Sequence, residues 1–368
     1  MLLPGHYIVS AWAEGMATAA GSPVDLYVGG VEQLQLRLTP VGRTETVAVN
    51  EQPEITETQG SGVSHVVPQE AIVNLPLNGR RFTDLALLTP GVTQDPRGLT
   101  SNSNGDLSFG GVRGYQNNFL VDGADNNNSF YAQARGRYRA PYQFSNEVIK
   151  EFRVSSNSYS AELGRAGGGV FNVVTKSGSN DWHGTAFYYG RDRFFDAQQA
   201  YATCKPDDRQ QQFGGTLGGP IRKDRAFFYA GFDENLLTVP SIMQFANGAA
   251  TVVPQPADYD YTDKPLVTAA AQQLNTMAGA YPTTMQGNAA FAKLDYTFSQ
   301  KHLAFVRLST SRYNGANNVF FDPASELTCY AESENGSESV RTESLAASLV
   351  ERLDEQPGHE SAGAIFAR

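Results

Sequence analysis

The residue types that usually carry chemistry are scattered along this sequence and do not form a reactive group. The five histidines are far apart, and no two have metal-site spacing: His6, His65, His183, His302 and His359. Gly167–Gly169 lacks the Lys-Ser/Thr of a phosphate-binding loop, and no nucleophile elbow or CxxC motif occurs. We therefore predict no catalytic residue, no cofactor and no metal, and do not expect an enzyme. A hydrolase using scattered Asp and Glu has no supporting motif.

Two smaller features leave alternatives open. Asp122, Asp125 and Asn127 could form a Ca²⁺ loop, but the Gly and distant Glu of an EF-hand are absent, which favours a polar turn. Cys204 and Cys329 lie in segments that read as loops, either as unrelated residues or as a disulfide. A disulfide would require the oxidising side of the inner membrane.

The composition favours a β-rich protein and argues against nucleic-acid binding. The chain has 368 residues and a net charge of −10, with 18% charged and 11% aromatic residues. No basic cluster with interleaved aromatics appears. No apolar run approaches the roughly 18 residues of a membrane helix, whereas a transmembrane barrel, whose strands alternate, would leave no such run.

The elements that would position functional residues are clearest at 107–123. Leu107–Gly114 and Phe119–Gly123 read as two short strands joined by a polar turn, and the second ends on Asp-Gly, a strong turn signal. Two further motifs flank this pair: Asn74–Val92, containing LPLNGRRF and LLTPGV, and Ala161–Gly178, where a glycine run precedes a strand.

These three motifs, in this order, resemble the plug domain of Oar-like TonB-dependent outer-membrane receptors. The resemblance implies a small α/β plug at 65–178 that gates a barrel. The plug motif contains Arg113, Gly114, Asp122 and Gly123. Arg113 could pair with Asp122 inside the plug or face the lumen wall, and in either case the two residues would hold the domain in place. Gly114 and Gly123 are expected at turns that disfavour a Cβ.

The chain before the plug divides into two parts. Residues 1–42 resemble the last strands of a carboxypeptidase regulatory-like β-sandwich, and residues 43–64 have the composition of a linker. The linker contains a candidate TonB box that would pair with the energy-transducing protein TonB by strand addition: Glu45, Thr46, Val47, Ala48 and Val49. The alternative is the last sandwich strand running into a linker.

Residues 179–330 have the pattern of the first strands of an antiparallel transmembrane β-barrel. Leu294, Tyr296 and Phe298 alternate with polar residues, and short turns alternate with long irregular stretches near 191–210 and 236–288. Aromatic clusters at 187–189 and 227–229 suit an interfacial girdle. An ordinary soluble β-sandwich would also alternate. Residues 331–368 are expected to form a polar tail with a composition typical of disorder.

The predicted fold is mainly β, with a partial β-sandwich, a plug and about half a dozen barrel strands. That is fewer than the 22 strands of large outer-membrane transporters. We therefore expect part of a receptor, with its signal peptide upstream, located in the outer membrane. Its expected partners are TonB, outer-membrane lipid and an unidentified ligand. The alternative is a secreted or surface-exposed β-rich adhesin or binding module.

Overall fold

The computed structural model describes most of the β-structure of the chain. The described residues are 5–11, 16–17, 19–27, 38–40, 63–75, 82–94, 107–112, 114–127, 145–157, 159, 163–195, 197, 208–243, 264–276, 279–299, 301–317, 327–328, 332–351 and 365–367. The candidate TonB box, Arg113, Cys204 and Cys329 lie outside them.

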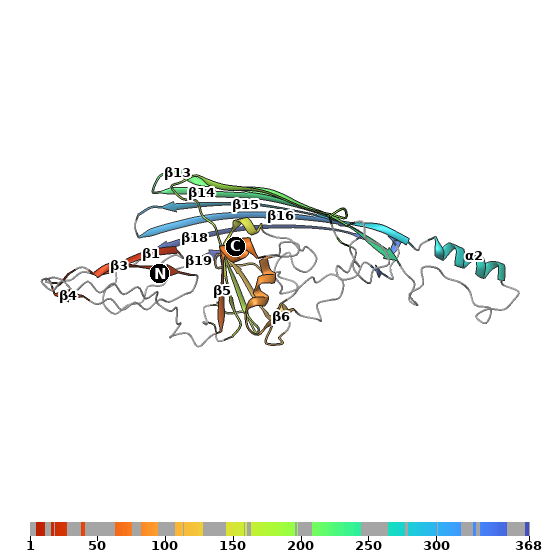
Figure 1. Ribbon diagram of the computed structural model, residues 1–368, viewed down its shortest axis with the longest axis horizontal. Helices are drawn as coiled ribbons and strands as arrows, with labels where there is room; N and C mark the ends of the chain where they lie inside the picture. Colours follow the sequence, from red (N-terminus) through yellow and green to blue (C-terminus); the bar gives the residue numbers. More distant parts are fainter. Residues whose placement is uncertain are drawn as a thin grey trace.

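A long antiparallel sheet forms one side of the molecule (Figure 1). Each strand pairs with its neighbour in the chain, apart from a short parallel addition, and among the described residues the sheet is open, with β12 and β19 at its edges. Its strands are β12 (His183–Asp192), β13 (Arg209–Arg222), β14 (Ala226–Met243), β15 (Gly279–Thr297), β16 (His302–Ala316), β18 (Ser337–Glu351) and β19 (Ile365–Ala367), with β17 (Leu327–Thr328) beside β14.

Alternation along these strands gives the sheet two different faces. On β15, the side chains of Leu294 and Tyr296 are 51% and 39% exposed. Lys293, which precedes Leu294 on the same strand, is 5% exposed and lies on the other face of the sheet. Leu308 and Leu345 are cross-strand partners on the apolar outer face. The predicted alternation of outward apolar and inward polar residues is confirmed here.

Three expectations about this region need correction. The stretch 236–288 is not irregular throughout, because β14 continues to Met243, α2 spans Lys264–Asn275 and β15 begins at Gly279. The expected polar tail is wrong over 337–351, where β18 pairs along its length with β16. In its second half, Ala346 and Ser348 are buried on one face, whereas Leu345 and Leu349 are exposed on the other, so a polar composition concealed a two-faced strand. Tyr229 belongs to no girdle, since it is 2% exposed on the inner face.

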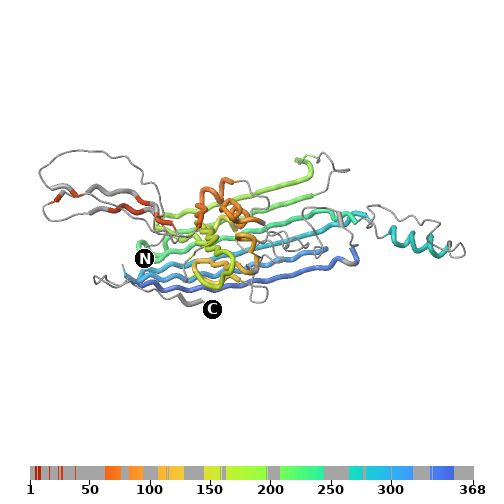
Figure 2. The backbone as a smooth tube through the Cα atoms, turned by 90° about the horizontal axis from the view of Figure 1, so that it is seen from below, coloured from red at the N-terminus to blue at the C-terminus, as the bar shows by residue number. Residues whose placement is uncertain are grey.

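A small five-stranded unit packs against the inner face of the sheet near its middle (Figures 1 and 2). Its strand order is β5-β10-β11-β8-β9, with β8 and β11 parallel. The strands are β5 (Ser64–Pro68), β8 (Asn118–Val121), β9 (Ala124–Asp125), β10 (Ile149–Ser155) and β11 (Val170–Thr175). The helical pieces are α1 (Gln69–Asn74), η2 (Phe82–Leu88), η4 (Gly114–Gln116) and η5 (Asn146–Val148), and β6 (Val92–Gln94) pairs with β7 (Leu107–Phe109).

The remaining described pieces lie at the two ends of the molecule. At the N-terminal end β1 (Gly5–Ala11) pairs with β3 (Ala19–Leu26), and β2 (Met16–Ala17) pairs with β4 (Thr39–Pro40). Helix α2 projects beyond the opposite end of the sheet (Figure 1). None of the helices within the described ranges has the length and apolar character needed to cross a membrane.

The five-stranded unit and the large sheet share one hydrophobic core. Phe152 and Phe171 stack inside the unit with ring centroids 4.8 Å apart. Tyr229 and Phe291 of the large sheet belong to the same buried cluster. Burial of apolar surface therefore favours the docked arrangement as well as the unit's own fold.

The predicted Asp-Gly turn is present between β8 and β9. Asp122 and Gly123 both have left-handed backbone conformations, with φ of 48° and 77°. Such a pair of positive φ angles is typical of a two-residue hairpin turn, in which Gly is strongly favoured at the second position. Gly114 begins the 3-10 turn η4.

Gly123→Val is expected to lower the unfolding free energy of the segment 65–178 by about 1–3 kcal/mol, because a β-branched residue is strained at positive φ. Urea denaturation of the expressed segment measures this. Gly167→Ala is the control, since a Cβ there meets Gln116 at an ordinary 3.5 Å contact. Equal stability of Gly123→Val and the parent would contradict the turn assignment.

Candidate functional site: the contact between the five-stranded unit and the large sheet

Asp122 is first held by its own unit. Its backbone N–H donates to the carbonyl of Val173 at 2.7 Å. The Thr175 backbone N–H donates to Asp122 Oδ1 at 2.9 Å, and the Thr175 hydroxyl donates to Oδ2 at 2.8 Å. The Asp-Gly turn therefore fixes the carboxylate at the end of β11, facing the large sheet.

Two cations of the large sheet meet this carboxylate. Arg307 Nη1 on β16 donates to Asp122 Oδ2 at 2.9 Å, and Lys293 Nζ on β15 lies 3.6 Å from Oδ1. The three side chains are only 3–6% exposed. Burial weakens screening by water and salt, so this ion pair joins the two parts more strongly than a surface pair would.

Neighbouring groups complete the cluster. Lys293 Nζ donates to the Thr175 hydroxyl at 3.2 Å and lies 4.8 Å from the centre of the Phe305 ring. Asp295 is close enough to Lys293 for an electrostatic interaction, and its Oδ2 is buried without a hydrogen-bond partner in the described part of the chain. Removing one member would leave an uncompensated buried charge, which typically costs about 3–5 kcal/mol.

A second contact is made by η5. The Tyr229 hydroxyl donates to the Glu147 carbonyl at 3.1 Å, and the Thr185 hydroxyl donates to the Glu147 carboxylate at 3.5 Å. A Cβ added to Gly231 would lie 2.7 Å from Val148 Cγ1, so glycine permits this close approach. Burial lowers the pKa of the nearby Lys176 amine, and the Glu147 carboxylate partly offsets this effect.

Asp125 lies outside the buried cluster and makes its contacts within the five-stranded unit. Its Oδ1 accepts hydrogen bonds from the backbone and side chain of Asn127 at 2.8 Å and 2.7 Å, and Oδ2 contacts Arg165. Partial burial raises its pKa, but Asn127 and Arg165 outweigh burial and leave the pKa below its usual value. These contacts support the polar-turn interpretation of the Asp122–Asn127 segment.

Sequence reasoning located half of this site. The proposed holding role agrees with the contacts of Asp122, but Arg113 lies outside the described residues, so its alternatives stay predictions. The sequence did not point to Lys293 and Arg307. Their signal was present, since a charged residue at an inward position of a barrel strand needs a buried partner.

Comparisons with known proteins agree with this arrangement. The family model of an outer membrane beta barrel domain matches residues 174–247. The TonB-dependent transporter Oar of Myxococcus xanthus is 29% identical over 247 residues, which cover 63% of this chain and 22% of that protein. The chain is related to the TonB-dependent outer-membrane receptors.

Other receptors support the same relationship. The ferrienterobactin receptor of Escherichia coli (strain K12) is 28% identical over 226 residues, covering 57% of this chain and 28% of that protein. The outer membrane transporter YddB from Escherichia coli superposes with a TM-score of 0.54 at 14% identity, covering 79% of this chain and 37% of that one. A mutant ferric enterobactin receptor (PfeA) from Pseudomonas aeruginosa gives 0.51 at 14% identity, covering 79% and 38%.

The receptor relationship identifies the parts of the fold. The large sheet is a partial barrel wall, and the chain is located in the outer membrane. The five-stranded unit corresponds to the predicted plug segment 65–178, and we call it the plug below. The relatives are transporters and receptors rather than enzymes, and the adhesin alternative is not favoured. The chain spans less than a third of the length of the curated relatives it matches.

Asp122→Asn is expected to weaken docking of the plug by about 3–5 kcal/mol, because Lys293 and Arg307 lose their buried counter-charge. Urea-dependent exposure of the plug to protease, in membranes carrying the chain, measures this. Asp192→Asn is the control: Asp192 is 48% exposed and only 4.0 Å from Arg209, a surface pair that contributes little. Equal urea midpoints for Asp122→Asn and Asp192→Asn would contradict the assignment.

Proposed function

We propose that this chain is the plug and the first part of the barrel of a TonB-dependent receptor that takes an unidentified ligand across the outer membrane. The buried contact of Asp122 with Lys293 and Arg307 carries the proposal. It joins a compact plug to the inner face of the wall through one polar cluster. Such a contact holds firmly while it is intact and is lost as a unit once one partner moves away.

The interface has the properties expected of a closed gate. Hydrogen bonds and the Asp122 ion pairs connect the plug to the wall, although Arg307 Nε and Asp295 Oδ2 are buried without a hydrogen-bond partner in the described part of the chain. Asn146 of η5 is likewise buried with neither its Nδ2 nor its Oδ1 paired there. Leaving both groups unpaired costs free energy in the docked state. Movement of η5 away from the wall would return Asn146 to water, and this gain partly offsets the loss of the Asp122 contacts.

We further propose that TonB supplies the movement through the segment Glu45–Val49. A short β-prone segment ahead of the plug can add as a strand to a partner's sheet, with backbone hydrogen bonds providing affinity. Only a short stretch of chain separates the segment from β5, so a pull on the segment would reach β5. Strand β5 pairs with β10, and β10 directly follows η5. No catalytic residue is assigned, and the chain is proposed to act by binding and gating alone.

Labelling of a buried reporter tests this proposal. In the complete receptor with Cys204 and Cys329 replaced by Ser, Asn146→Cys is expected to react with a maleimide several-fold faster in cells that contain TonB than in cells that lack it. Adding Val47→Pro should remove the difference, because proline lacks the N–H that strand pairing needs. Val47→Thr should preserve it.

Ser179→Cys is the reporter control, since Ser179 is exposed and should label equally in both strains. Equal labelling of Asn146→Cys with and without TonB would contradict TonB-driven gating. A TonB-dependent difference that survives Val47→Pro would instead contradict only the placement of the TonB box.

A further inference from the structure

The outer face of the sheet changes from apolar to cationic within a few residues. Leu308 and Leu345 are direct cross-strand neighbours, 52% and 57% exposed. Four residues further along the same two strands, Arg312 and Arg341 are also direct cross-strand neighbours. Four residues of strand separate the two pairs by about 13 Å. A molecule lying along this face would meet apolar side chains first and then two guanidinium groups.

The two arginines are placed unfavourably unless an anion joins them. Like charges directly opposite each other in a sheet are destabilising, with Cβ atoms about 4.5–5.5 Å apart. Arg341 Nε donates to Glu343 at 2.8 Å, but Arg312 has no ion-pair or hydrogen-bond partner in the described part of the chain. The group of Arg312, Arg341 and Glu343 therefore keeps a net positive charge.

A hollow of about 710 Å³ connects the arginines to the apolar surface. Its lining includes the apolar residues Phe232, Leu308 and Leu345 together with Arg312 and Arg341. Between the larger side chains, the register places Ala290 beside Phe232 and Ala292 beside Leu308. Thr310 and Glu343, cross-strand neighbours between the leucine pair and the arginine pair, also line the hollow, so a groove runs from the apolar belt toward the charged pair.

The arginines lie toward the external end of the barrel. The connections β13–β14 and β15–β16 are short turns, whereas those from β14 to β15 and from β16 to β18 are long. Long connections mark the extracellular side of an outer-membrane barrel. Arg312 is near the end of β16 that leads into a long connection, so the pair lies toward the external side of the wall.

We propose that this groove binds a phosphorylated lipid of the outer leaflet. Its acyl chains lie against Phe232, Leu308 and Leu345, and its phosphate accepts hydrogen bonds from Arg312 and Arg341. Arginine suits this role because its planar fork of donors matches phosphate oxygens. The bound phosphate also relieves the repulsion between the two guanidinium groups.

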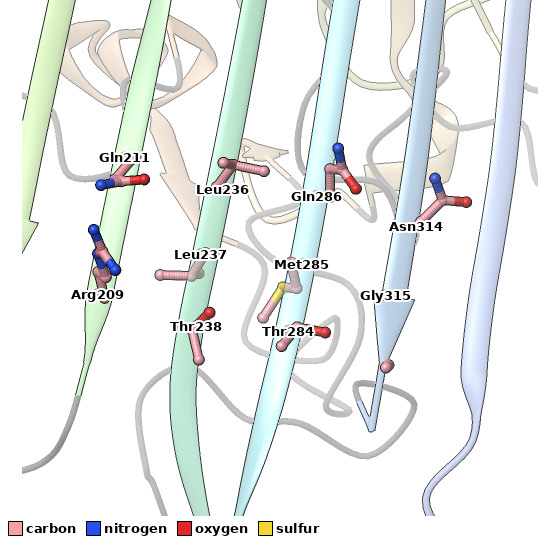
Figure 3. A pocket seen from close by; sticks show the side chains of 11 residues that line it. Arg209, Gln211, Leu236, Leu237, Thr238, Thr284, Met285, Gln286, Asn314 and Gly315 are labelled. Carbon is pink, nitrogen blue, oxygen red and sulfur yellow. The ribbon is translucent and has the colours of Figure 1, made fainter.

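A neighbouring hollow provides a matched comparison. It has a volume of about 410 Å³, and the residues that line it include one cation, Arg209, together with Gln211, Gln286 and Asn314 (Figure 3). Arg209 is opposite Thr238 in the register, and no second arginine faces it. Removing Arg209 changes the net charge by the same amount as removing Arg312 but leaves the arginine pair intact.

The test uses the full chain purified from outer membranes in detergent and titrated with a bisphosphorylated acyl glycolipid, with bound lipid counted by native mass spectrometry. The double variant Arg312→Ser/Arg341→Ser is expected to bind roughly ten- to thirtyfold more weakly. Arg312→Ser alone should weaken binding several-fold, and Arg209→Ser should leave it within twofold. The phosphate-free form of the same glycolipid should bind the parent as weakly as the phosphorylated form binds the double variant.

Several outcomes would overturn the proposal. Undiminished binding by the double variant, or an equal loss with Arg209→Ser, would show that the arginine pair is not the site. Equal affinity for the phosphate-free glycolipid would show an apolar groove without phosphate recognition. Complete displacement of the glycolipid by millimolar inorganic phosphate would show a site for free anions rather than for a lipid.

Discussion

The carboxylate of Asp122 lies between Arg307 and Lys293 in a contact that is almost closed to water, and the position of the plug depends on it. Buried charges depend on good mutual geometry and on further hydrogen bonds. Thr175 donates two hydrogen bonds to the carboxylate from the plug side, and Phe305 covers Lys293 from the wall side. Arg307 Nε has no hydrogen-bond partner in the described part of the chain. The Asp-Gly turn, the end of β11 and two barrel strands must therefore be correctly placed together.

The sheet contacts three environments because the side chains along each strand alternate between its two faces. Its inner face offers the charges and the Tyr229 hydroxyl that hold the plug. Its outer face has an apolar belt that includes Leu294, Leu308 and Leu345. Beyond the belt, near the long connections, the same outer face carries polar residues. One strand such as β16 contributes Arg307 to the plug contact and Arg312, five residues later, to the outer face. An odd separation along a strand is sufficient to change the face.

The sequence predicted much of the architecture and part of the site. Short-range signals were reliable: the Asp-Gly turn and the alternation of β15 both appear where they were predicted. Long-range features were not visible. The partners of Asp122 are 171 and 185 residues away in the chain, and nothing in the local pattern specifies that pairing. The tail was misjudged because a high content of Ser and Glu is typical both of disorder and of a polar strand face.

A double-mutant cycle measures whether Asp122 and Arg307 hold the plug through their mutual contact. The free energy of releasing the plug from the wall is measured in membranes by urea titration. It is compared for the parent, Asp122→Asn, Arg307→Gln and the double variant. If the two side chains hold the plug through their mutual contact, the single effects are not additive and the coupling energy is about 1–3 kcal/mol. Additivity within about 0.3 kcal/mol would show that neither residue acts through the other, and would contradict the account.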